Sequence, residues 1–343
     1  MRQINWSNII GHKNKISQIR DMIKSQQFPN AVVFAGADGI GKRRIAEVAA
    51  AALLCENDNA PCGHCSSCKV FAAGTHPDYY YLEPDKTKAN PVIKVDQIRS
   101  MQSEVILMPV ISNRRIVIID DAECMNNVAQ NCLLKTIEEP QGLSKFILIT
   151  SNLSRLLLTI RSRSMTINFE SLTAEEIERA LTAQNIDNAS KIAIIANGSL
   201  GQAFKLAEND GLQIREDVIK FLETLSSLNI ENIFVKGQAL AALPKDYFIS
   251  WTINFQKILR DILILSADVN IENEYFYNRD IKARLNKIKT NLAEAEIFKM
   301  LHESAEVQRR LRSNANLELL IESFFIRLKN SKSNDELGIM NLE

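Results

Sequence analysis

The segment from Gly36 to Arg43 matches the phosphate-binding loop pattern G-x-x-x-x-G-K-[ST] except at its last position. Gly36, Gly39 and Gly41 would let backbone N–H groups curl around a phosphate, and Lys42 would reach its β and γ oxygens. The last position normally carries a hydroxyl that binds Mg²⁺, and here it is Arg43. The segment therefore predicts a nucleotide-binding loop that has lost part of its hydrolytic chemistry.

Polar residues follow two later apolar stretches. Asp120 and Asp121 end the first, and Asn152 follows the second. In a P-loop fold such a strand lies beside the loop, which would place Asp120 near Mg²⁺ and Asp121 near the attacking water. Acids commonly end strands, so this interpretation depends on the loop upstream. Asp121 is also one methylene shorter than a glutamate, and Asn152 could face either a γ-phosphate or solvent.

Four cysteines lie within fourteen residues at two C-x-x-C spacings, and they are Cys55, Cys62, Cys65 and Cys68. Thiolates at these spacings can converge on one tetrahedral Zn²⁺ at about 2.3 Å, and four protein ligands leave no open position for a catalytic water. The cluster therefore predicts a structural zinc site. A redox pair is the alternative, although it needs only two cysteines. His64 or His76 could also replace a sulfur ligand, but the preferred interpretation of each is a surface loop residue.

Arg163 lies in the segment Arg161-Ser-Arg-Ser164, directly before a predicted strand. If this segment is extended, Arg161 and Arg163 share one face. An arginine here can stay solvated, pair with a nearby acid, or project into a nucleotide bound by a neighbour, where a fixed guanidinium stabilises charge on the γ-phosphate. From the residues alone, a solvated or ion-paired arginine is the preferred interpretation.

Short apolar runs alternate with helical patterns in the first half of the chain. The predicted strands are residues 30–35, 79–82, 115–120, 145–150 and 165–169. Helices are predicted at residues 44–54 and 127–139, the second ended by Pro140. This alternation predicts a parallel sheet covered on both faces.

After residue 169 the pattern is helical. Capping boxes at Thr173 and Ser199, with an apolar helix at 192–196 between them, predict three short helices. Longer helices are predicted at 247–266 and 317–328, where apolar residues recur at spacings of three and four. One such stripe is expected to be core, and its members are Phe255, Ile258, Leu259, Ile262 and Leu263.

The composition is that of a globular protein, with 343 residues, 46% of them hydrophobic and 24% charged. Lys+Arg and Asp+Glu number 41 each, so no strong overall field attracts nucleic acid or an anionic membrane. The sequence contains no apolar run of about 20 residues and no secretion pattern at its beginning. We therefore expect a cytoplasmic protein with reduced thiols and no membrane partner.

Taken in order, these motifs resemble the AAA+ clamp-loader subunits of bacterial DNA polymerase III. The similarity covers nearly the whole chain, and the ordered set is specific although no single motif is. The similar segments are Trp6-x-x-Ile9-Ile10-Gly11, the phosphate loop, the four cysteines, Gly74-Thr-His-Pro-Asp78, Ile119-Asp120-Asp-Ala122, Leu133-Leu-Lys-Thr-Ile-Glu-Glu-Pro140, Ser162-Arg163-Ser164 and Asn314-Ala-Asn316-Leu317.

The resemblance implies an α/β AAA+ core with an inserted zinc module, a small helical lid and an all-α collar. The expected boundaries are 1–170 for the core with the Cys₄ insertion at 55–76, 171–208 for a three-helix lid, 209–331 for the collar that mediates oligomerisation, and 332–343 for a flexible tail.

Three departures from the family's ATP-hydrolysing motor subunits imply a largely inactive stator. Arg43 replaces the Mg²⁺-binding hydroxyl, Gly201 stands where motor subunits carry a nucleotide-sensing arginine, and the chain ends soon after the collar. Ser164 replaces the cysteine of the family's Ser-Arg-Cys element but leaves Arg163 intact. The resemblance thus implies that Arg163 is a finger acting in trans on ATP bound by the adjacent subunit.

The partners that the resemblance implies are the motor and clamp-opening subunits in a five-membered ring, the sliding clamp, and primed DNA through the complex. The implied cofactors are structural zinc, with ATP and Mg²⁺ weak or absent in the chain's own site. One alternative is an ATP-hydrolysing motor subunit that tolerates Arg43 and Gly201. Another is a free-standing zinc nucleic-acid binder, although net neutrality and few basic residues near the cysteines count against it.

Overall fold

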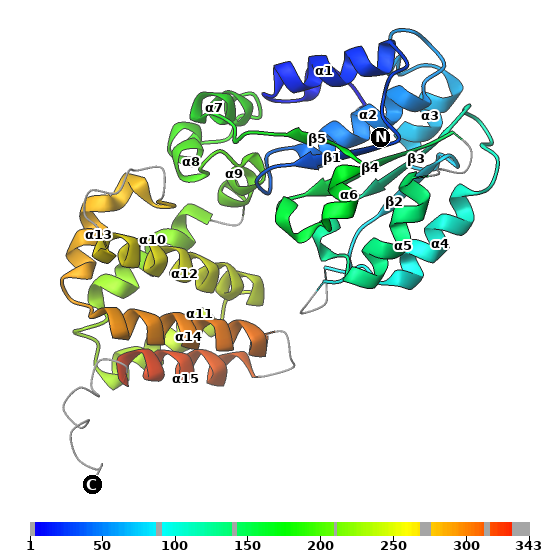
Figure 1. The fold of residues 1–343 in the computed structure, drawn as a ribbon. Coiled ribbons are helices and arrows are strands. Elements are labelled where there is room, and N and C mark those ends of the chain that lie inside the picture. Colours follow the sequence, from blue (N-terminus) through cyan, green and yellow to red (C-terminus); the bar gives the residue numbers. More distant parts are fainter. Residues whose placement is uncertain are drawn as a thin grey trace. The chain divides into compact units, whose positions relative to one another are not determined.

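The computed structural model describes residues 4–86, 91–138, 143–208, 211–267, 276–311 and 316–330. Contacts divide the chain into two units, Met1–Gln184 with Gly198–Gln202, and Asn185–Asn197 with Ala203–Glu343 (Figure 1). None of the helices in the described ranges is long and apolar enough to cross a bilayer.

The first unit is built on a five-stranded parallel sheet in the order β2-β3-β4-β1-β5. Its strands are β1 (Ala31–Ala35), β2 (Tyr79–Leu82), β3 (Arg115–Ile119), β4 (Ser144–Thr150) and β5 (Met165–Asn168). Val32 of β1 is in register with Ile147 of β4 on one side and Met165 of β5 on the other. Every residue of β1 and β3 is buried, as expected of parallel strands covered on both faces. The predicted parallel sheet is confirmed.

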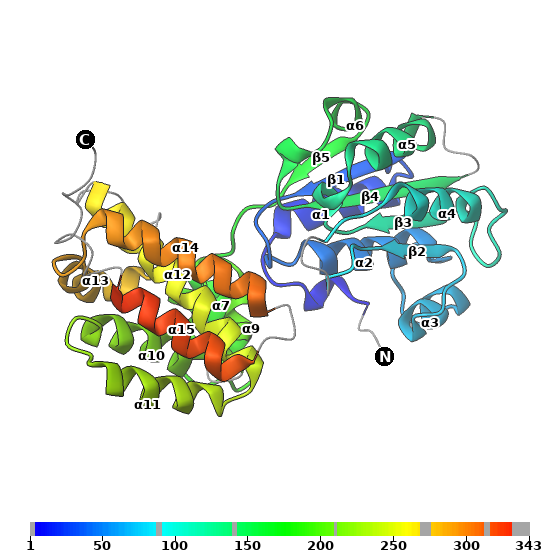
Figure 2. The ribbon, with the colours of Figure 1, turned by 90° about the horizontal axis from the view of Figure 1, so that it is seen from below.

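Helices cover both faces of this sheet, and Figure 2 shows α2 and α3 on one side and α5 and α6 on the other. The helices α1 (Lys13–Lys24), α2 (Lys42–Leu54) and α3 (Ser66–Ala73) share a core with Val32, Phe34 and Ile118. The helices α4 (Val95–Val105), α5 (Asn127–Glu138) and α6 (Leu158–Ser162) share a second core with Val33, Val117 and Ile119. Alternate residues of one strand thus enter different cores.

One sequence-based expectation near the predicted sites is wrong, and another falls on residues that the structure does not describe. The segment before β5 is the short helix α6, so Arg161 and Arg163 are not in extended backbone and do not share one face. Helical rather than extended backbone is consistent with the full burial of Ile160 in the core that also contains residues of β3 and β4. The described end of α5 is Glu138, and Pro140, predicted to end that helix, lies outside the described residues.

The three predicted lid helices are α7 (Ala174–Thr182), α8 (Ala189–Ile195) and α9 (Leu200–Ala207). Thr173 caps α7 in the predicted capping box with Glu176. Contacts assign α7 to the first unit and α8 to the second. The division into a core, a separate lid at 171–208 and a collar from 209 therefore stays a prediction.

The second unit is helical throughout its described residues. Beyond α8 it contains α10 (Gly211–Thr224), α11 (Ile230–Ala241), α12 (Lys245–Ala267), α13 (Lys282–Lys289), α14 (Glu294–Leu311) and α15 (Leu317–Asn330). Trp251 and Phe255 of α12 stack in its core with their ring centroids 5.2 Å apart. Of the apolar stripe on α12, four residues are fully buried and Leu263 packs at the edge. The predicted tail, residues 332–343, and Asn314 lie outside the described residues.

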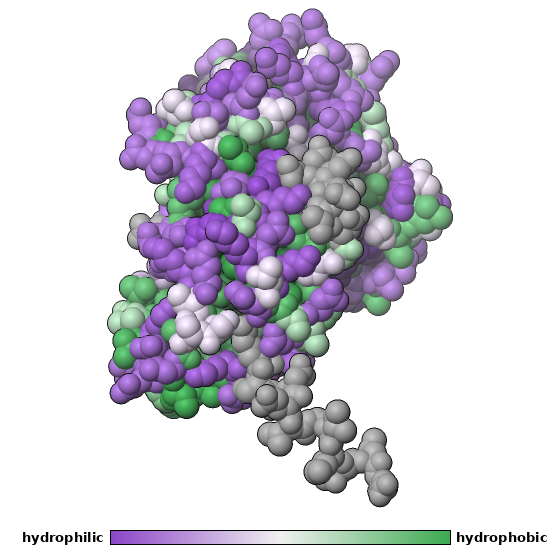
Figure 3. All heavy atoms as spheres, turned by 90° about the vertical axis from the view of Figure 1, so that its left-hand side faces the viewer, coloured by the Kyte–Doolittle hydropathy of each residue, from purple (hydrophilic) through white to green (hydrophobic). Residues whose placement is uncertain are grey.

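Apolar side chains also reach the surface of this helical unit. Ile230 and Val235 of α11, Phe298 of α14 and Leu319 of α15 are each more than 60% exposed. The face drawn in Figure 3 has apolar residues interspersed with hydrophilic ones. Apolar residues exposed singly are common on protein surfaces, whereas a contiguous apolar patch would mark a surface that binds another chain.

Candidate phosphate, metal and arginine sites

The glycine loop connects the end of β1 to the start of α2, as a phosphate-binding loop requires. Gly36, Gly39 and Gly41 all have positive φ, at 153°, 75° and 102°. Lys42, only 5% exposed, donates from Nζ to the carbonyl oxygens of Gly36 at 2.7 Å and Ala37 at 2.6 Å. Burial lowers the pKa of Lys42, although nearby acids oppose the shift. Two of the three N–H donors of this ammonium group are therefore engaged by the loop itself.

The loop is also packed directly against the start of α9. Gly201 donates its backbone N–H to the carbonyl oxygen of Gly39 at 2.8 Å. A Cβ on Gly201 would lie 3.1 Å from the Cα of Gly39, and a Cβ on Gly39 would collide with Ser199 Oγ. Any larger residue at position 201, including the arginine that motor subunits carry there, would require the loop at Gly39 to shift by a few tenths of an ångström.

Arg43 occupies the place where the missing hydroxyl would help to hold Mg²⁺. Its guanidinium lies over the ring of Tyr81, 4.6 Å from the centroid, and pairs with Glu83 at 3.3 Å and with Asp120 at 3.8 Å. The Tyr81 hydroxyl donates to Asp120 Oδ2 at 2.7 Å. Burial, reinforced by the charge of Asp121, raises the pKa of Asp120 despite this hydrogen bond. The carboxylate predicted to bind Mg²⁺ is thus held by side chains of this chain.

The second predicted acid has its own cation as well. Asp121 pairs with Lys86, Nζ to Oδ2, at 3.0 Å, and its backbone is left-handed with φ 48°. Asn152, for which the sequence left a γ-phosphate or solvent open, accepts through Oδ1 from the backbone N–H of Ser154 at 3.2 Å and from its hydroxyl at 2.6 Å.

A further carboxylate, Glu123, lies at this end of the sheet and was not predicted from the sequence. It accepts from the backbone N–H of Ser151 at 2.9 Å and from the Ser151 hydroxyl. Its other carboxylate oxygen is buried with no hydrogen-bond partner among the described residues. Burial would raise the pKa of Glu123, but the hydrogen bonds from Ser151 outweigh it and lower the pKa. Only its position three residues after Asp120 could have indicated it.

Arg163 caps the end of α6 on the protein surface, with its side chain 43% exposed. Its Nε forms an ion pair with Glu138, the last residue of α5, and its Nη1 donates to the carbonyl oxygen of Thr159 at 3.3 Å. In the isolated chain Arg163 is thus ion-paired, which is one of the two states, solvated or ion-paired, that the residues alone favoured. Glu138 was not predicted as its partner.

The phosphate loop and Arg163 lie at opposite ends of the same strands. Arg163 precedes β5, whose first residue, Met165, is in register with Val32 near the start of β1. The loop begins after Ala35, at the other end of β1. With a rise of about 3.3 Å per residue, the strands separate the two sites by roughly 10–15 Å. Arg163 therefore lies away from any phosphate bound in the loop of its own chain.

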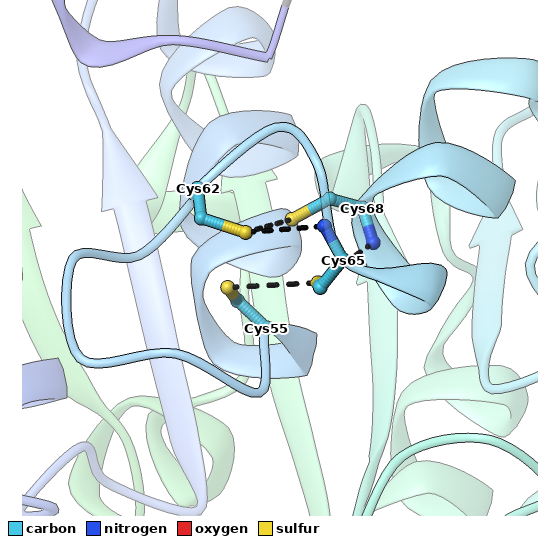
Figure 4. A group of neighbouring side chains, drawn as sticks. All are labelled: Cys55, Cys62, Cys65 and Cys68. Atoms are coloured by element: carbon cyan, nitrogen blue, oxygen red, sulfur yellow. Dashed lines mark hydrogen bonds between the residues drawn. The ribbon is translucent and has the colours of Figure 1, made fainter.

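The four cysteines converge between the end of α2 and the start of α3 (Figure 4). Their sulfur atoms all lie within 4.8 Å of one another, and the Cys55–Cys65 and Cys62–Cys68 sulfurs are each 3.9 Å apart. A tetrahedron with metal–sulfur distances of about 2.3 Å has edges of about 3.8 Å, so the geometry fits one tetrahedral ion. Four cysteines so arranged could hold a metal ion.

Backbone and amide groups already point at these sulfurs. The backbone N–H of Cys65 donates to Cys62 Sγ at 3.4 Å, and Asn57 Nδ2 donates to the same sulfur at 3.1 Å. Burial would raise the pKa of Cys62, but these donors lower it to about 5. Burial raises the pKa of Cys68. Donors arranged around sulfur are typical of sites where thiolates bind a metal.

The two histidines considered as ligands are not part of the group of four converging sulfurs, and His64 Nδ1 lies 2.9 Å from the carbonyl oxygen of Cys62. His76 is buried and not at the surface as expected. Its Nε2 is 3.0 Å from the oxygen of the Ser67 hydroxyl, whose hydrogen is donated to the carbonyl oxygen of Leu54. Asp78 accepts three backbone N–H groups, from residues 110, 111 and 112, at 2.7–2.8 Å. The Gly74–Asp78 motif therefore fastens the cysteine module and the loop before β3 to the core.

The sheet order, the glycine loop after β1 and the acids after β3 define the class of this protein, an AAA+ P-loop fold with an inserted four-cysteine module and a helical C-terminal region. The family described as "DNA polymerase III, delta subunit" matches residues 11–173. The "DNA polymerase III subunit delta'" of Pseudomonas aeruginosa is 30% identical over 315 residues, which cover 88% of this chain and 92% of that protein.

Two further relatives extend this comparison. The subunit delta' of Bacillus subtilis is 26% identical over 332 residues, which cover 95% of this chain and 99% of that protein. The subunit tau/gamma of Haemophilus influenzae is 29% identical over 213 residues, which cover 59% of this chain but only 30% of that protein. The chain belongs to the DNA polymerase III subunit delta' family.

Proposed function

We propose that this protein is the delta' subunit of a DNA polymerase III clamp loader. It assembles with motor and clamp-opening subunits in a five-membered ring and helps to place the sliding clamp on primed DNA in the cytoplasm. Membership of the delta' family over nearly the whole chain supports this assignment. In this assembly, the exposed apolar residues of α11, α14 and α15 would be available for contacts with other subunits.

Within that complex the protein is a stator with little or no ATPase activity of its own. The observation that carries this proposal is the internal pairing at the phosphate loop, where Lys42 binds loop carbonyls and Arg43 pairs with Asp120. Lys42, which would act on ATP, is engaged by backbone carbonyls, and Asp120, which would bind Mg²⁺, is engaged by Arg43 and Tyr81. We therefore expect this loop to bind ATP weakly or not at all.

Arg163 is the proposed chemical contribution of the subunit. Its guanidinium is half exposed at the end of the sheet remote from its own loop, so it can act on ATP only in trans. A fixed guanidinium beside a γ-phosphate stabilises the charge that develops during phosphoryl transfer. The adjacent motor subunit would supply the ATP, the Mg²⁺ and the attacking water.

We propose that the cysteine module holds structural zinc through Cys55, Cys62, Cys65 and Cys68. With four protein ligands, the ion would hold the end of α2 to the start of α3 and supply no catalytic chemistry. Replacing Cys62 with serine is expected to remove the metal, measured by elemental analysis of the purified chain. An unchanged zinc content in this variant would contradict the assignment.

The experiment that tests the function is reconstitution of the full-length chain with motor and clamp-opening subunits, followed by a clamp-loading assay on primed DNA. Loading should require this chain, and the purified chain alone should show no DNA-stimulated ATP turnover. Because the chain is also 29% identical to a tau/gamma subunit over 213 residues, a motor function is the alternative. Vigorous ATP turnover by the isolated chain would establish that alternative and reject the stator.

A further inference from the structure

Glu138 and Arg163 come from two different helices that pack against each other, α5 and α6. Glu138 is the last residue of α5, and Arg163 directly follows α6. Their side chains form an ion pair between Oε1 and Nε, with similar exposure, 41% and 43%. The guanidinium is held a second time by the carbonyl oxygen of Thr159, which accepts from Nη1. Arg163 is therefore fixed from both helices.

Neither of these contacts uses Nη2 of the guanidinium. The pair borders a surface depression of about 620 Å³, which Asn30 and Met165 also line. A side chain anchored through Nε and Nη1 keeps donor hydrogens available for an acceptor that enters this depression. Arginine has many rotamers, so an anchored guanidinium loses less conformational freedom when it meets a phosphate.

We propose that Glu138 is a positioning residue for Arg163. Its carboxylate holds the guanidinium in the orientation in which it meets the ATP of the adjacent subunit, and it keeps this contact during the reaction. This inference rests on the proposed function, because it presupposes that Arg163 acts in trans. The opposite arrangement, in which Glu138 competes with the phosphate for Arg163, predicts a change of the opposite sign.

The test uses the reconstituted complex with four versions of the full-length chain: Glu138→Ala, Glu138→Gln, Arg163→Ala and the double variant Glu138→Ala/Arg163→Ala. Glu138→Ala should lower kcat for ATP about tenfold at the affected site, because a loosely held group is misplaced in the transition state. KM for ATP should not change, since the neighbour's own loop binds the nucleotide. Glu138→Gln should restore part of the rate, because its amide oxygen still accepts from Nε.

The double variant separates positioning from a structural role. If Glu138 acts only through Arg163, the double variant has the same kcat as Arg163→Ala alone. An additive loss in the double variant overturns the proposal, and so does an unchanged or raised kcat in Glu138→Ala. Full activity of Arg163→Ala would instead reject the finger itself, whatever Glu138 does. The two failures are therefore distinguishable.

The matched control is Asp96→Ala, which removes the acid of another exposed pair, with Arg99 at 3.6 Å on α4. This change alters the net charge as Glu138→Ala does but lies on a different helix. It should leave kcat within twofold of the unmodified complex. Equal losses from Asp96→Ala and Glu138→Ala would indicate a general effect of charge and overturn the proposal.

Discussion

The two ends of one sheet carry the same kinds of polar side chain in opposite states. At the carboxyl ends of the strands, Lys42 and Asp120 are almost fully buried and are held by groups of the same chain. At the amino ends, Arg163 and Glu138 pair with each other but stay about two-fifths exposed. Groups of the first kind are engaged within the fold, whereas those of the second kind remain accessible to another molecule.

The comparison indicates that a fold can keep the backbone of a motif while the side chains of that motif are engaged elsewhere. The glycine loop keeps the backbone shape of a phosphate site, because its positive φ angles serve the connection between β1 and α2. The charged side chains at the loop, Lys42 and Arg43, are engaged in contacts within the chain. Substitutions at the loop should therefore change stability more than catalysis, and substitutions at Arg163 should do the reverse.

The largest expected effect is on ATP turnover by the reconstituted complex. Arg163→Ala should slow turnover at the site it faces by ~10³-fold, because the transition state loses a fixed positive charge. Lys42→Ala, which removes the equivalent charge from the loop, should leave turnover within twofold. The measurement is phosphate release in the presence of clamp and primed DNA. A large loss from Lys42→Ala would show that the loop of this chain binds a nucleotide that matters.

The next effect is on stability and tests whether the loop is closed. Gly201→Arg, which introduces the motor-type residue, should lower the free energy of unfolding by about 1–3 kcal/mol, because its Cβ meets Gly39. Gly201→Ala isolates the contribution of the Cβ from that of the long side chain. Amide hydrogen exchange in β1 and β4 reports opening of this unit. If Gly201→Arg is as stable as the unmodified chain and binds ATP, the loop is an open site.

A smaller, pH-dependent effect is expected at Glu123. Its pKa is lowered in the folded chain, so its contribution to stability is fully present above the unfolded pKa of about 4.3 and is lost as the pH falls through the folded value. Glu123→Gln should cost about 1 kcal/mol at pH 7. The difference from the unmodified chain should shrink below about pH 4. A difference that stays constant from pH 7 to pH 3 would exclude the carboxylate charge as its source.

The strands and both chemical motifs could be predicted from the sequence because their signals are local. Five apolar runs became five parallel strands, and the spacing of four cysteines predicted a cluster that the structure brings within 4.8 Å. The predicted capping box at Thr173 is present for the same reason, since its two partners lie three residues apart. Signals of this kind need no tertiary context.

The pairing of the site residues could not be predicted because it depends on contacts between distant segments. Arg43 meets Asp120 only after β3 and α2 have packed together, and Gly39 meets Gly201 only when α9 docks on the loop. The helix α6 was missed for a related reason, since burial of Ile160 decides the backbone of a polar segment. The contacts of Tyr81 with Asp120 and of Lys86 with Asp121 were also missed, because each joins segments that are distant in the sequence.

The smallest expected effect concerns Ser164, which stands beside Arg163. Its hydroxyl oxygen is buried and has no hydrogen-bond partner among the described residues, and a buried unpaired hydroxyl destabilises a fold. Ser164→Ala should therefore raise the free energy of unfolding by about 1 kcal/mol, measured by hydrogen exchange in β5. It should leave turnover by the complex unchanged. Ser162→Ala is the matched control, because the Ser162 hydroxyl donates to Thr159 at 3.1 Å and its loss should not stabilise the chain. If Ser164→Ala were destabilising, the hydroxyl would have a partner, and the end of the sheet that carries Arg163 would be as internally paired as the phosphate loop.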